Sequence, residues 1–544
     1  MIKGNVEKID LSTSSFERII SDQSLYVDKT RLIEHFLGEI SQVQLIARHR
    51  RLGKSLNMDM LRLFLTDSVD YRHLFKGLYI ESSPVWNQAH SAPVLYFDFK
   101  NLSHKSYQNE IFVQIAEYLD QYIDIQRLSP IETRRFNQYL DRNGEDHNGL
   151  LYLTKLIYKQ TGKRSYIFID EYDKLLMDSY HTDQYEEIQR YETLLLSAGL
   201  KGNPYLAKAL LTGVLRISHE SMLSGLNNLK TYDVFSDRVF TYDYGLTDWE
   251  IDELRKLTHF DRQRTKDWYN GIKIGGSAIY NIYSTMAMLD SGKFDCFWGK
   301  SGMLDIILNL LTDERKALLE RLLNGDSVEV EVAERISVQN LYTNVKDSGF
   351  FSLLVQAGYL SLDEEILDKN LMRISIPNRE LSIVWKEFIF DQLYNGARSL
   401  KTLFDHTDDM ERFAENIESF LSDSLSYHDL AVYSNERGER VEERIYHIFT
   451  LGILSAYKNA TYKKPMSNRE SGDGRYDILV EKDRKNFIFE FKSRADAKEL
   501  VATAQQALAQ IDEKRYGADL DKNKPLIKIG IAFSGKLCKA ICEQ

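Results

Sequence analysis

Hydrophobic and polar positions predict a β-hairpin near the C-terminus. Apolar, β-branched and aromatic residues dominate 476–480 and 487–491, with a charged turn between them. Such runs, bounded by polar residues, are typical of two antiparallel strands. Alternation with period two places Glu490 and Lys492 on one face of the second strand, with its phenylalanines on the other. If the two strands pair, Asp477 reaches the face of Glu490.

Helical patterns flank this hairpin. An apolar stripe at helical spacing runs through 441–457, and 495–514 is free of proline and rich in Ala and Gln. Both segments predict helices, one before and one after the two strands.

The N-terminal half shows strands that end in polar residues. An apolar strand runs through Ala47 into Gly53-Lys54-Ser55, and a segment with helical periodicity, 56–64, follows. A second apolar strand begins at Ser165 and ends in Asp170-Glu171, and a third covers 210–212. This order of strands and helical segments is typical of an α/β domain.

The middle of the chain shows helical periodicity without a catalytic constellation. Thr247 and Glu250 predict a capping box at the start of a helix. Two amphipathic helices are expected over 301–324. The segment 346–375 predicts a small winged-helix-type unit, with a hairpin around 363–368 as its wing. This unit either packs against the N-terminal domain or binds DNA, and its acidic hairpin favours packing.

The C-terminal hairpin presents the residues of a metal-dependent nuclease. Asp477 and Glu490 are expected to bind Mg²⁺, with the carbonyl of Phe491 as a third ligand. Lys492 would orient or activate a water and stabilise the charged phosphate. The alternative is that Glu490 and Lys492 form a solvated pair on an edge strand.

These residues resemble the PD-(D/E)xK nuclease superfamily, in the branch that accompanies an AAA-ATPase-like domain. The resemblance runs from about residue 467 to 536 and includes the first helix as well. It implies that Glu443 contributes to the metal site, although Glu442 is an equally polar neighbour. Gln510 and Tyr516 resemble a glutamine and a tyrosine of RecB-like members; as an alternative, they are polar residues on a helix surface.

The N-terminal segments predict a nucleotide site. Backbone N–H groups at a helix N-terminus hold phosphates, with Lys54 at the β/γ oxygens and Ser55 at Mg²⁺. Asp170 would hold the water shell of the Mg²⁺, and Glu171 would polarise the attacking water. Alternatively, Asp170 and Glu171 are a strand end followed by an acidic helix cap. The usual first glycine of the loop is Arg48 here, so the motif is degenerate.

This half of the chain resembles the AAA-ATPase-like family. The family commonly has Arg-Pro-Arg-Arg-Phe-Gly-Lys-Ser, and this chain has His49 and Leu52 in place of the proline and the phenylalanine. The resemblance implies that Thr212 senses the γ-phosphate, and Arg216 is either a phosphate-facing arginine or a surface charge. The residues that it implies for nucleotide binding are Arg48, Arg51, Gly53, Lys54, Ser55, Leu56, Asp170, Glu171, Thr212 and Arg216.

Composition and charge narrow the setting. The chain has 544 residues and a net charge of −11, yet residues 431–544 carry 21 Lys and Arg against 17 Asp and Glu, which is +4 there and −15 elsewhere. Nucleic acid is therefore expected at the C-terminal domain. Three cysteines form neither a disulfide framework nor a zinc site, and neither a membrane span nor a secretory leader is expected. The expected location is the cytoplasm.

Together these patterns predict a multidomain α/β protein. An AAA-like P-loop domain would cover 1–245, a helical lid with a winged-helix-like region 246–426, and a PD-(D/E)xK restriction-endonuclease-like domain 427–544. The expected function is cleavage of DNA, rather than RNA, by an ATP-regulated nuclease that uses Mg²⁺ or Mn²⁺. By analogy with the family it would act in defence or on mobile elements. The alternatives are an ATP-switched scaffold and a nuclease with a purely structural nucleotide fold, each as a monomer or a homo-oligomer.

Overall fold

The chain divides into two compact units in a computed structural model. Unit 1 is Met1–Ser382 and unit 2 is Ile383–Gln544. The structure describes residues 2–544 except for 142–145, 180–181, 218–227, 299–306, 308–309, 324, 334–346, 369–370, 386–403, 405–406, 425–465, 468–469, 472, 483–484, 495, 519, 522 and 535–536.

A five-stranded parallel sheet forms the centre of unit 1. Its order is β4-β5-β6-β3-β7, and every neighbouring pair is parallel. The inner strands are buried on both faces, which explains their continuous apolar runs. Because parallel strands end at one edge, the residues after β3, β5 and β6 come together there. The strands are β3 (Val43–Ala47), β4 (Val94–Asp98), β5 (Ser165–Asp170), β6 (Leu206–Gly213) and β7 (Leu229–Tyr232).

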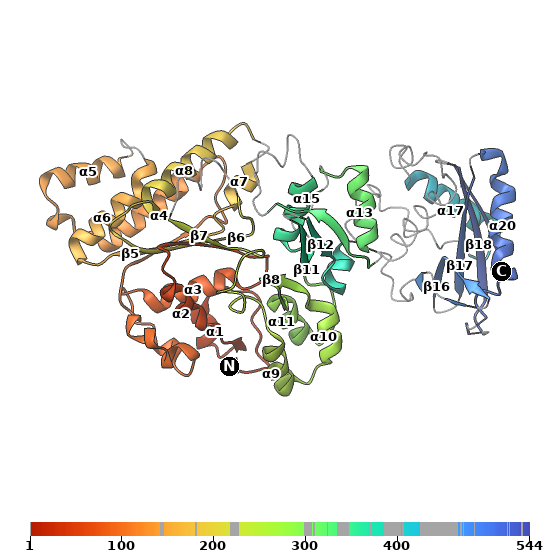
Figure 1. Cartoon of the computed structure of the whole chain (residues 1–544), viewed down its shortest axis with the longest axis horizontal. Helices are drawn as coiled ribbons and strands as arrows, with labels where there is room; N and C mark the ends of the chain where they lie inside the picture. The colour runs from red at the N-terminus through yellow and green to blue at the C-terminus, as the bar shows by residue number, and fades with distance from the viewer. Residues whose placement is uncertain are drawn as a thin grey trace. The chain divides into compact units, whose positions relative to one another are not determined.

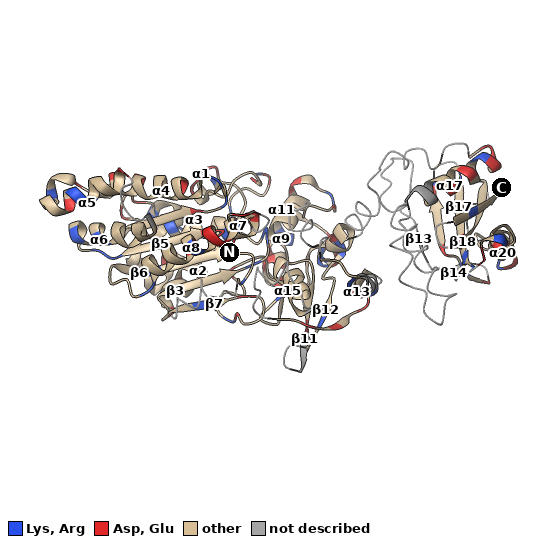
Figure 2. Cartoon of the chain, turned by 90° about the horizontal axis from the view of Figure 1, so that it is seen from above, with Lys and Arg blue, Asp and Glu red and all other residues tan. Residues whose placement is uncertain are grey.

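Helices cover both faces of this sheet, as Figure 1 shows. On one face lie α1 (Phe16–Ser21), α2 (Arg31–Gly38) and α3 (Lys54–Leu65); on the other lie α4 (Tyr107–Tyr122), α6 (Gly149–Thr161) and α8 (Tyr185–Leu200), with α5 (Pro130–Leu140) beside them. In Figure 2 the strands of the sheet are almost entirely uncharged, and the charged residues lie mainly on helices and loops. This layering confirms the predicted α/β class of the N-terminal half.

The rest of unit 1 is built from helices and short strands. Thr247 and Glu250 form the predicted capping box at the start of α9, and α13 is the second of the two helices expected over 301–324. Most of the first lies outside the described residues. The elements are α7 (Lys174–Ser179), α9 (Asp248–Thr258), α10 (Arg262–Tyr269), α11 (Ile282–Ser291) and α13 (Asp313–Leu323), with the strand pairs β1 (Ile2–Lys3) with β2 (Tyr26–Val27) and β8 (Ile272–Ile274) with β9 (Ser277–Ile279).

A helix and a small antiparallel sheet end unit 1. Helix α15 (Asp347–Ala357) precedes the hairpin of β11 (Ser361–Asp368) and β12 (Leu371–Ser375), and β10 (Val328–Glu331) pairs with β12. The predicted order of helix and hairpin is therefore present, although 363–368 is strand rather than turn. Its assignment as a winged helix stays a prediction.

Unit 2 is a mixed five-stranded sheet between helices. The order is β13-β16-β17-β18-β19, in which β17 and β18 are parallel and the other pairs antiparallel. Helix α17 packs against β19, and α20 packs against β17, β18 and β19. The elements are α17 (Met410–Ser424), β13 (Met466–Ser467), β16 (Ile478–Glu481), β17 (Asn486–Ser493), α20 (Leu500–Glu513), β18 (Leu526–Ser534) and β19 (Leu537–Glu543), with the separate pair β14 (Glu470–Ser471) and β15 (Gly474–Arg475). Helix α17 lies before residue 427, where the sequence placed the last domain boundary, yet it packs within unit 2.

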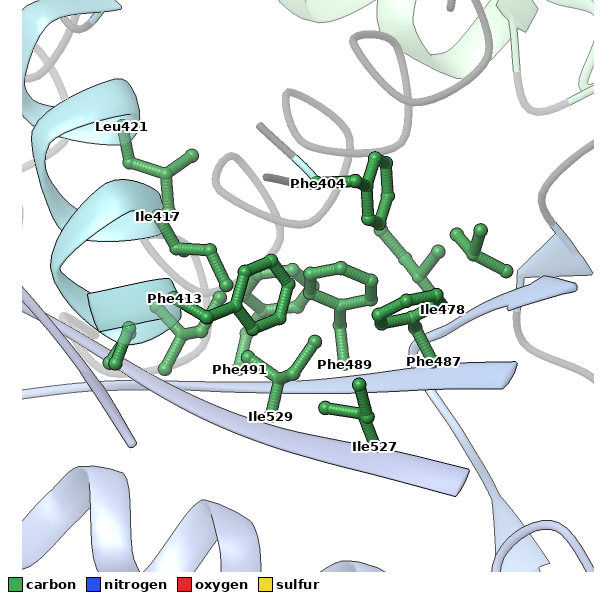
Figure 3. Packing of buried hydrophobic residues seen from close by; sticks show 14 of the residues in the cluster. Phe404, Phe413, Ile417, Leu421, Ile478, Phe487, Phe489, Phe491, Ile527 and Ile529 are labelled. Atoms are coloured by element: carbon green, nitrogen blue, oxygen red, sulfur yellow. The ribbon is translucent and has the colours of Figure 1, made fainter. Parts of the chain in front are cut away.

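Alternation along β17 divides the core of unit 2 into two layers. Phe487, Phe489 and Phe491 point toward α17 in one cluster (Figure 3), while Ile488 packs with Ile511 of α20 in another. Burying one such side chain stabilises the fold by about 1.5–3 kcal/mol. The same alternation leaves positions 490 and 492 for the α20 side of the sheet.

Candidate functional site

The loop between β3 and α3 begins the first site. Gly53 has φ of 89°, a left-handed conformation that residues with a Cβ rarely adopt, and α3 starts directly afterwards at Lys54. The loop therefore places the N-terminus of a twelve-residue helix at the carboxyl edge of the sheet. Such helix ends attract anions because their N–H groups have no partner within the helix.

Lys54 is buried inside this loop. Its Nζ donates to the carbonyl oxygens of Arg48 and His49 at 3.0 and 2.9 Å. Burial lowers the pKa of Lys54 to about 8, against the opposing pull of nearby carboxylates, of which Asp170 acts most strongly. Because Lys54 is poorly solvated, an anion that binds beside it stabilises its charged form.

The ends of β5 and β6 meet beside the loop. The hydroxyl of Thr212 donates to Asp170 Oδ1, so the expected sensor and the expected metal carboxylate are in direct contact. Glu171 follows with φ of 54°, and burial raises its pKa above the ordinary range. The structure thus brings Asp170, Glu171 and Thr212 to the same edge as Lys54, although they are far apart in the sequence.

A cavity of about 720 Å³ opens at this edge. The residues from Arg50 to Asn57, together with Glu171, line it, and its apolar lining residues include Leu11, Ile282 and Met286. Its charged lining residues are six cations and three acids, namely Lys29, Arg50, Arg51, Lys54, Lys100 and Lys174 against Asp10, Glu171 and Asp243. The excess of positive charge suits a polyphosphate, and the apolar side chains suit a flat base.

The second site lies on the α20 face of unit 2. Register places Asp477 opposite Glu490, one step beyond the pair of Ile478 and Phe489. Asp477 Oδ2 accepts from the Phe491 N–H at 2.9 Å, and Glu490 Oε2 accepts from the Asp477 N–H at 3.4 Å. The two carboxylates are therefore fixed by the backbone of the hairpin itself.

Gln510 of α20 completes this arrangement. Lys492 Nζ donates to Gln510 Oε1 at 2.7 Å, and Gln510 Nε2 donates to Glu490 Oε1. Tyr516 lies at the edge of the network, 3.5 Å from the Gln510 amide. Glu490 is 4 % exposed, so the alternative of a solvated pair on an edge strand does not fit. Nor is Gln510 merely a polar residue on a helix surface.

Family models match the two regions that contain these sites. The model for predicted AAA-ATPases, AAA-ATPase_like, matches residues 10–223, and a model of the PD-(D/E)XK nuclease superfamily, PDDEXK_9, matches residues 441–543. The chain contains an AAA-ATPase-like domain and a PD-(D/E)XK nuclease superfamily domain.

One relative, aligned over most of both chains, and two solved structures accompany these matches. An uncharacterized protein in the vnfD 5' region of Azotobacter chroococcum mcd 1 is 26% identical over 97% of this chain and 96% of that protein. The Walker-type ATPase of Pyrococcus abyssi is 13% identical, with a TM-score of 0.29 over 66% of this chain and 94% of that one. The ORC2 protein of Aeropyrum pernix is 12% identical, with a TM-score of 0.29 over 69% and 98%. The assignment of the N-terminal domain rests on the family model, since these structural likenesses are distant.

Two arginines expected at the nucleotide are held elsewhere in the AAA-ATPase-like domain. Arg48 is fully buried, pairs with Asp237 and donates to the carbonyl of Tyr232 at 3.0 Å. Arg216 pairs with Asp233 at 2.7 Å, with 15 % of its side chain exposed. Neither arginine lines the cavity, and Arg216 is not an ordinary surface charge either. A buried cation needs a partner, which explains why both are paired.

Arg51 and Leu56 of the loop do line the cavity. Arg51 has φ of 63°, donates to the Phe297 carbonyl and stacks over the Tyr283 ring at 4.2 Å. The side chain of Arg51 therefore holds the phosphate loop to the segment around Phe297.

Sequence reasoning assigned no role to Arg50 and Asp173. Arg50 lines the cavity beside Lys54. Asp173 is buried, and its Oδ2 accepts from the N–H groups of Val214 and Leu215 at 2.9 and 2.8 Å, which fixes the segment after β6. The signal in both cases was a charged residue within a matched motif, but only the fold shows which way each side chain turns.

One expected residue of the nuclease superfamily domain falls outside the description. Glu443, with its neighbour Glu442, belongs to the undescribed segment 425–465. Among the described residues no three His, Cys, Asp or Glu side chains cluster as a metal site. Asp477 and Glu490 still place two carboxylates opposite each other on neighbouring strands. Carboxylate oxygens are the ligands that Mg²⁺ and Mn²⁺ prefer. Within the described part of the chain no helix is long and apolar enough to cross a membrane.

Proposed function

We propose that this chain is a nucleotide-regulated, metal-dependent nuclease that hydrolyses phosphodiester bonds of DNA. The observation that carries the proposal is the network of Asp477, Glu490, Lys492 and Gln510 on one face of a sheet. Two fixed carboxylates beside a lysine supply the groups that phosphodiester hydrolysis needs. The net charge of +4 over residues 431–544 supports a nucleic-acid substrate at this domain.

The carboxylates would hold Mg²⁺ or Mn²⁺. When bound, the ion would neutralise the scissile phosphate and lower the pKa of a coordinated water. The Phe491 N–H holds the Asp477 carboxylate in place, and Gln510 holds that of Glu490. Because these contacts already fix the donors, little reorganisation is needed when substrate arrives.

Lys492 acts on the phosphate side of the reaction. The Gln510 carbonyl oxygen, 2.7 Å from Nζ, fixes where the ammonium lies relative to Glu490. From there Lys492 orients the attacking water and stabilises the added negative charge on the phosphate oxygens. Gln510 contacts both Lys492 and Glu490, so it is a positioning residue for the two of them.

ATP is the proposed regulator, bound at the cavity of unit 1. Lys54 and the N-terminus of α3 would hold its phosphates, while Ser55 and Asp170 would hold Mg²⁺. Glu171 would polarise water for hydrolysis. A role in defence or in handling mobile elements is the proposed biological setting, and it follows from the family resemblance.

The test is cleavage of linear, circular and single-stranded DNA by the full chain with Mg²⁺ or Mn²⁺, with and without ATP. Asp477→Asn keeps an acceptor for the Phe491 N–H but removes the charge, so we expect cleavage to fall at least about 100-fold. Asp512→Asn is the matched control, because Asp512 is an exposed acid of the same domain that pairs with Lys528. Full activity of Asp477→Asn would overturn the mechanism.

A second candidate function is an ATP-switched scaffold that binds nucleic acid or protein without cutting. The observation in its favour is that the Gln510 amide already engages both Lys492 and Glu490. This function predicts oligomerisation or binding that depends on Lys54, with no metal-dependent cleavage by the wild-type protein. Cleavage that Lys54→Ala leaves unchanged, with or without ATP, would instead leave the nucleotide fold a structural role.

A further inference from the structure

The basic residues around the nucleotide cavity differ in what they already contact. Arg48 and Arg216 are paired with aspartates outside the cavity, and Arg51 is bound to the Phe297 carbonyl and the Tyr283 ring. Lys174 pairs with Asp178, one turn along α7. These four side chains are therefore committed to the protein itself.

Arg50 is different. It lies in the phosphate loop and lines the cavity, yet across the described residues its guanidinium has no hydrogen bond or ion pair. It lines the same cavity as Lys54, which lies four residues further along the loop. Two cations held near each other repel unless an anion lies between or beside them.

We propose that Arg50 is a phosphate-binding residue that recognises the terminal phosphate of a nucleoside triphosphate, in the same chain that supplies Lys54. The proposal rests on the proposed nucleotide site. A guanidinium donates two parallel hydrogen bonds to phosphate oxygens, whereas an ammonium acts as a point charge. Arg50 therefore supplies the additional positive charge that a triphosphate needs relative to a diphosphate, without an arginine from a neighbouring subunit.

The experiment compares ATP and ADP affinity of the full chain by titration calorimetry in Mg²⁺. We expect Arg50→Ala to weaken ATP binding by about 10-fold or more, the size of a lost charge-assisted hydrogen bond, with ADP affinity nearly unchanged. Retained ADP binding also shows that the variant is folded. Arg50→Lys should recover part of the loss.

Three variants separate the possible outcomes. Lys100→Ala removes another cavity-lining cation that has no side-chain partner among the described residues. If this variant loses as much ATP affinity as Arg50→Ala, the loss reflects the total positive charge of the cavity and not a specific contact of Arg50. Equal weakening of ATP and ADP in Arg50→Ala, or no weakening, would overturn the role of Arg50. If Lys54→Ala leaves both affinities intact, the proposed nucleotide site itself is wrong.

A separate observation concerns the end of α15. His49 of the phosphate loop lies 2.9 Å from the Val355 carbonyl through Nε2, and the Arg216 N–H, just after β6, donates to Gln356 Oε1 at 2.7 Å. The two segments that flank Lys54 and Thr212 thus bind consecutive residues of one helix. His49 and Gln356 are both almost completely buried.

The turn after α15 is shaped to this contact. Gly358 has φ of 88°, and a Cβ there would lie 2.8 Å from the His49 ring. Burial lowers the pKa of His49 to about 3, so the ring is neutral and its Nε2–H donates to Val355. The carbonyl of the same His49 accepts from Lys54, which links the lysine to α15 through a single residue.

The geometry points to α15 as the element that responds to nucleotide. A phosphate that draws Lys54 away from the His49 carbonyl changes the position of a residue whose ring is locked to α15. Because α15 contacts both the loop of Lys54, through His49, and the segment after Thr212, through Arg216, movement of either segment acts on this helix. This inference also rests on the proposed nucleotide site.

Hydrogen exchange of the full chain, with and without ATP, tests the coupling. We expect exchange in α15 to change about 5-fold or more on adding ATP, and the change to be lost in His49→Ala and Gln356→Ala. His49→Gln keeps a donor for the Val355 carbonyl and should retain the ATP-dependent change in α15. The exposed helix α5 is the control segment. An unaltered α15 alongside a response at 53–56 would overturn the coupling; no response at 53–56 would count against nucleotide binding instead.

Discussion

The two sites of this protein are built in opposite ways. In unit 1 the loop around Lys54 meets Asp170 and Thr212 from two other strands, so the site closes only when distant segments assemble. In unit 2 Asp477 and Glu490 lie on neighbouring strands of one hairpin, and a single helix adds Gln510. The first site depends on long-range packing, and the second depends mainly on register.

Burial of charge follows the same division. Lys54, Arg48, Asp173 and Glu171 of unit 1 are wholly or largely buried, and most of these charges are balanced by one another or by backbone groups. In unit 2 Glu490 is almost completely buried as well, whereas Lys492 remains partly exposed. Both sites therefore contain at least one buried charge, and they differ in how many charged groups they bury.

The largest effect is expected from the packing of unit 2. Phe489→Ala removes a side chain that is 2 % exposed in the cluster under α17, and we expect a loss of about 3–5 kcal/mol in unfolding free energy. Denaturant unfolding of the full chain, monitored by hydrogen exchange in unit 2, measures this loss. Val501→Ala on α20 is the control, since Val501 is half exposed. A loss below about 1 kcal/mol would contradict the layered core.

The second effect concerns positioning in the nuclease site. Gln510→Ala removes the contacts of the Gln510 amide with Lys492 and with Glu490, and we expect cleavage to fall about 10–100-fold. The measurement is the initial rate of DNA cleavage across a Mg²⁺ titration. Gln510→Glu keeps an acceptor for Lys492 but loses the donor to Glu490 and places a second carboxylate beside it, so it should lose activity as well. A rate equal to that of the wild type would remove Gln510 from the site.

Replacing Lys54 is expected to stabilise the protein, unlike the substitution of Phe489. Its pKa is about 8 in the folded protein and near 10.5 when unfolded, so the unfolded chain binds more protons between these values and stability rises with pH there. Below about pH 8 the buried charge is therefore destabilising. We expect Lys54→Met to raise the unfolding free energy by about 1–3 kcal/mol at pH 7, with the gain vanishing above about pH 10.5.

Thermal unfolding of Lys54→Met and wild type across this pH range checks the gain. Lys100→Met is the control, because Lys100 is exposed. A variant less stable than the wild type at pH 7 would show that the contacts of Lys54 with the loop carbonyls outweigh its desolvation.

The smallest effect belongs to an exposed pair near the nuclease site. Arg515 and Asp473 lie 2.5 Å apart, but 71 % and 54 % of their side chains are exposed. We expect Arg515→Ala to change the unfolding free energy by less than about 0.5 kcal/mol, and the change to shrink with salt. Thermal unfolding at low and high ionic strength measures it. A loss above about 1 kcal/mol would mean that this region is held by charge rather than by packing.

The hairpin of unit 2 was predictable because a period of two fixes the face of each residue. Glu490 and Lys492 had to share a face, and a paired strand had to bring Asp477 to it. Strands β3, β5 and β6 of the parallel sheet and helix α3 were likewise predicted from apolar runs and the Gly53-Lys54-Ser55 turn, whereas β4 and β7 were not. The contact of Lys492 with Gln510 was not readable, because it depends on how α20 lies across β17.

The sequence by itself determined which segments become strands and helices, and which chemical groups each carries. Only the tertiary structure decided which partner each charged side chain has. Arg48 and Arg216 pair with aspartates, Arg51 donates to a carbonyl, and Arg50 lines the cavity. Local patterns encode periodicity, whereas the partner of a buried charge is set by residues far away in the chain. A charge that leaves water must find such a partner, and only the assembled fold supplies it.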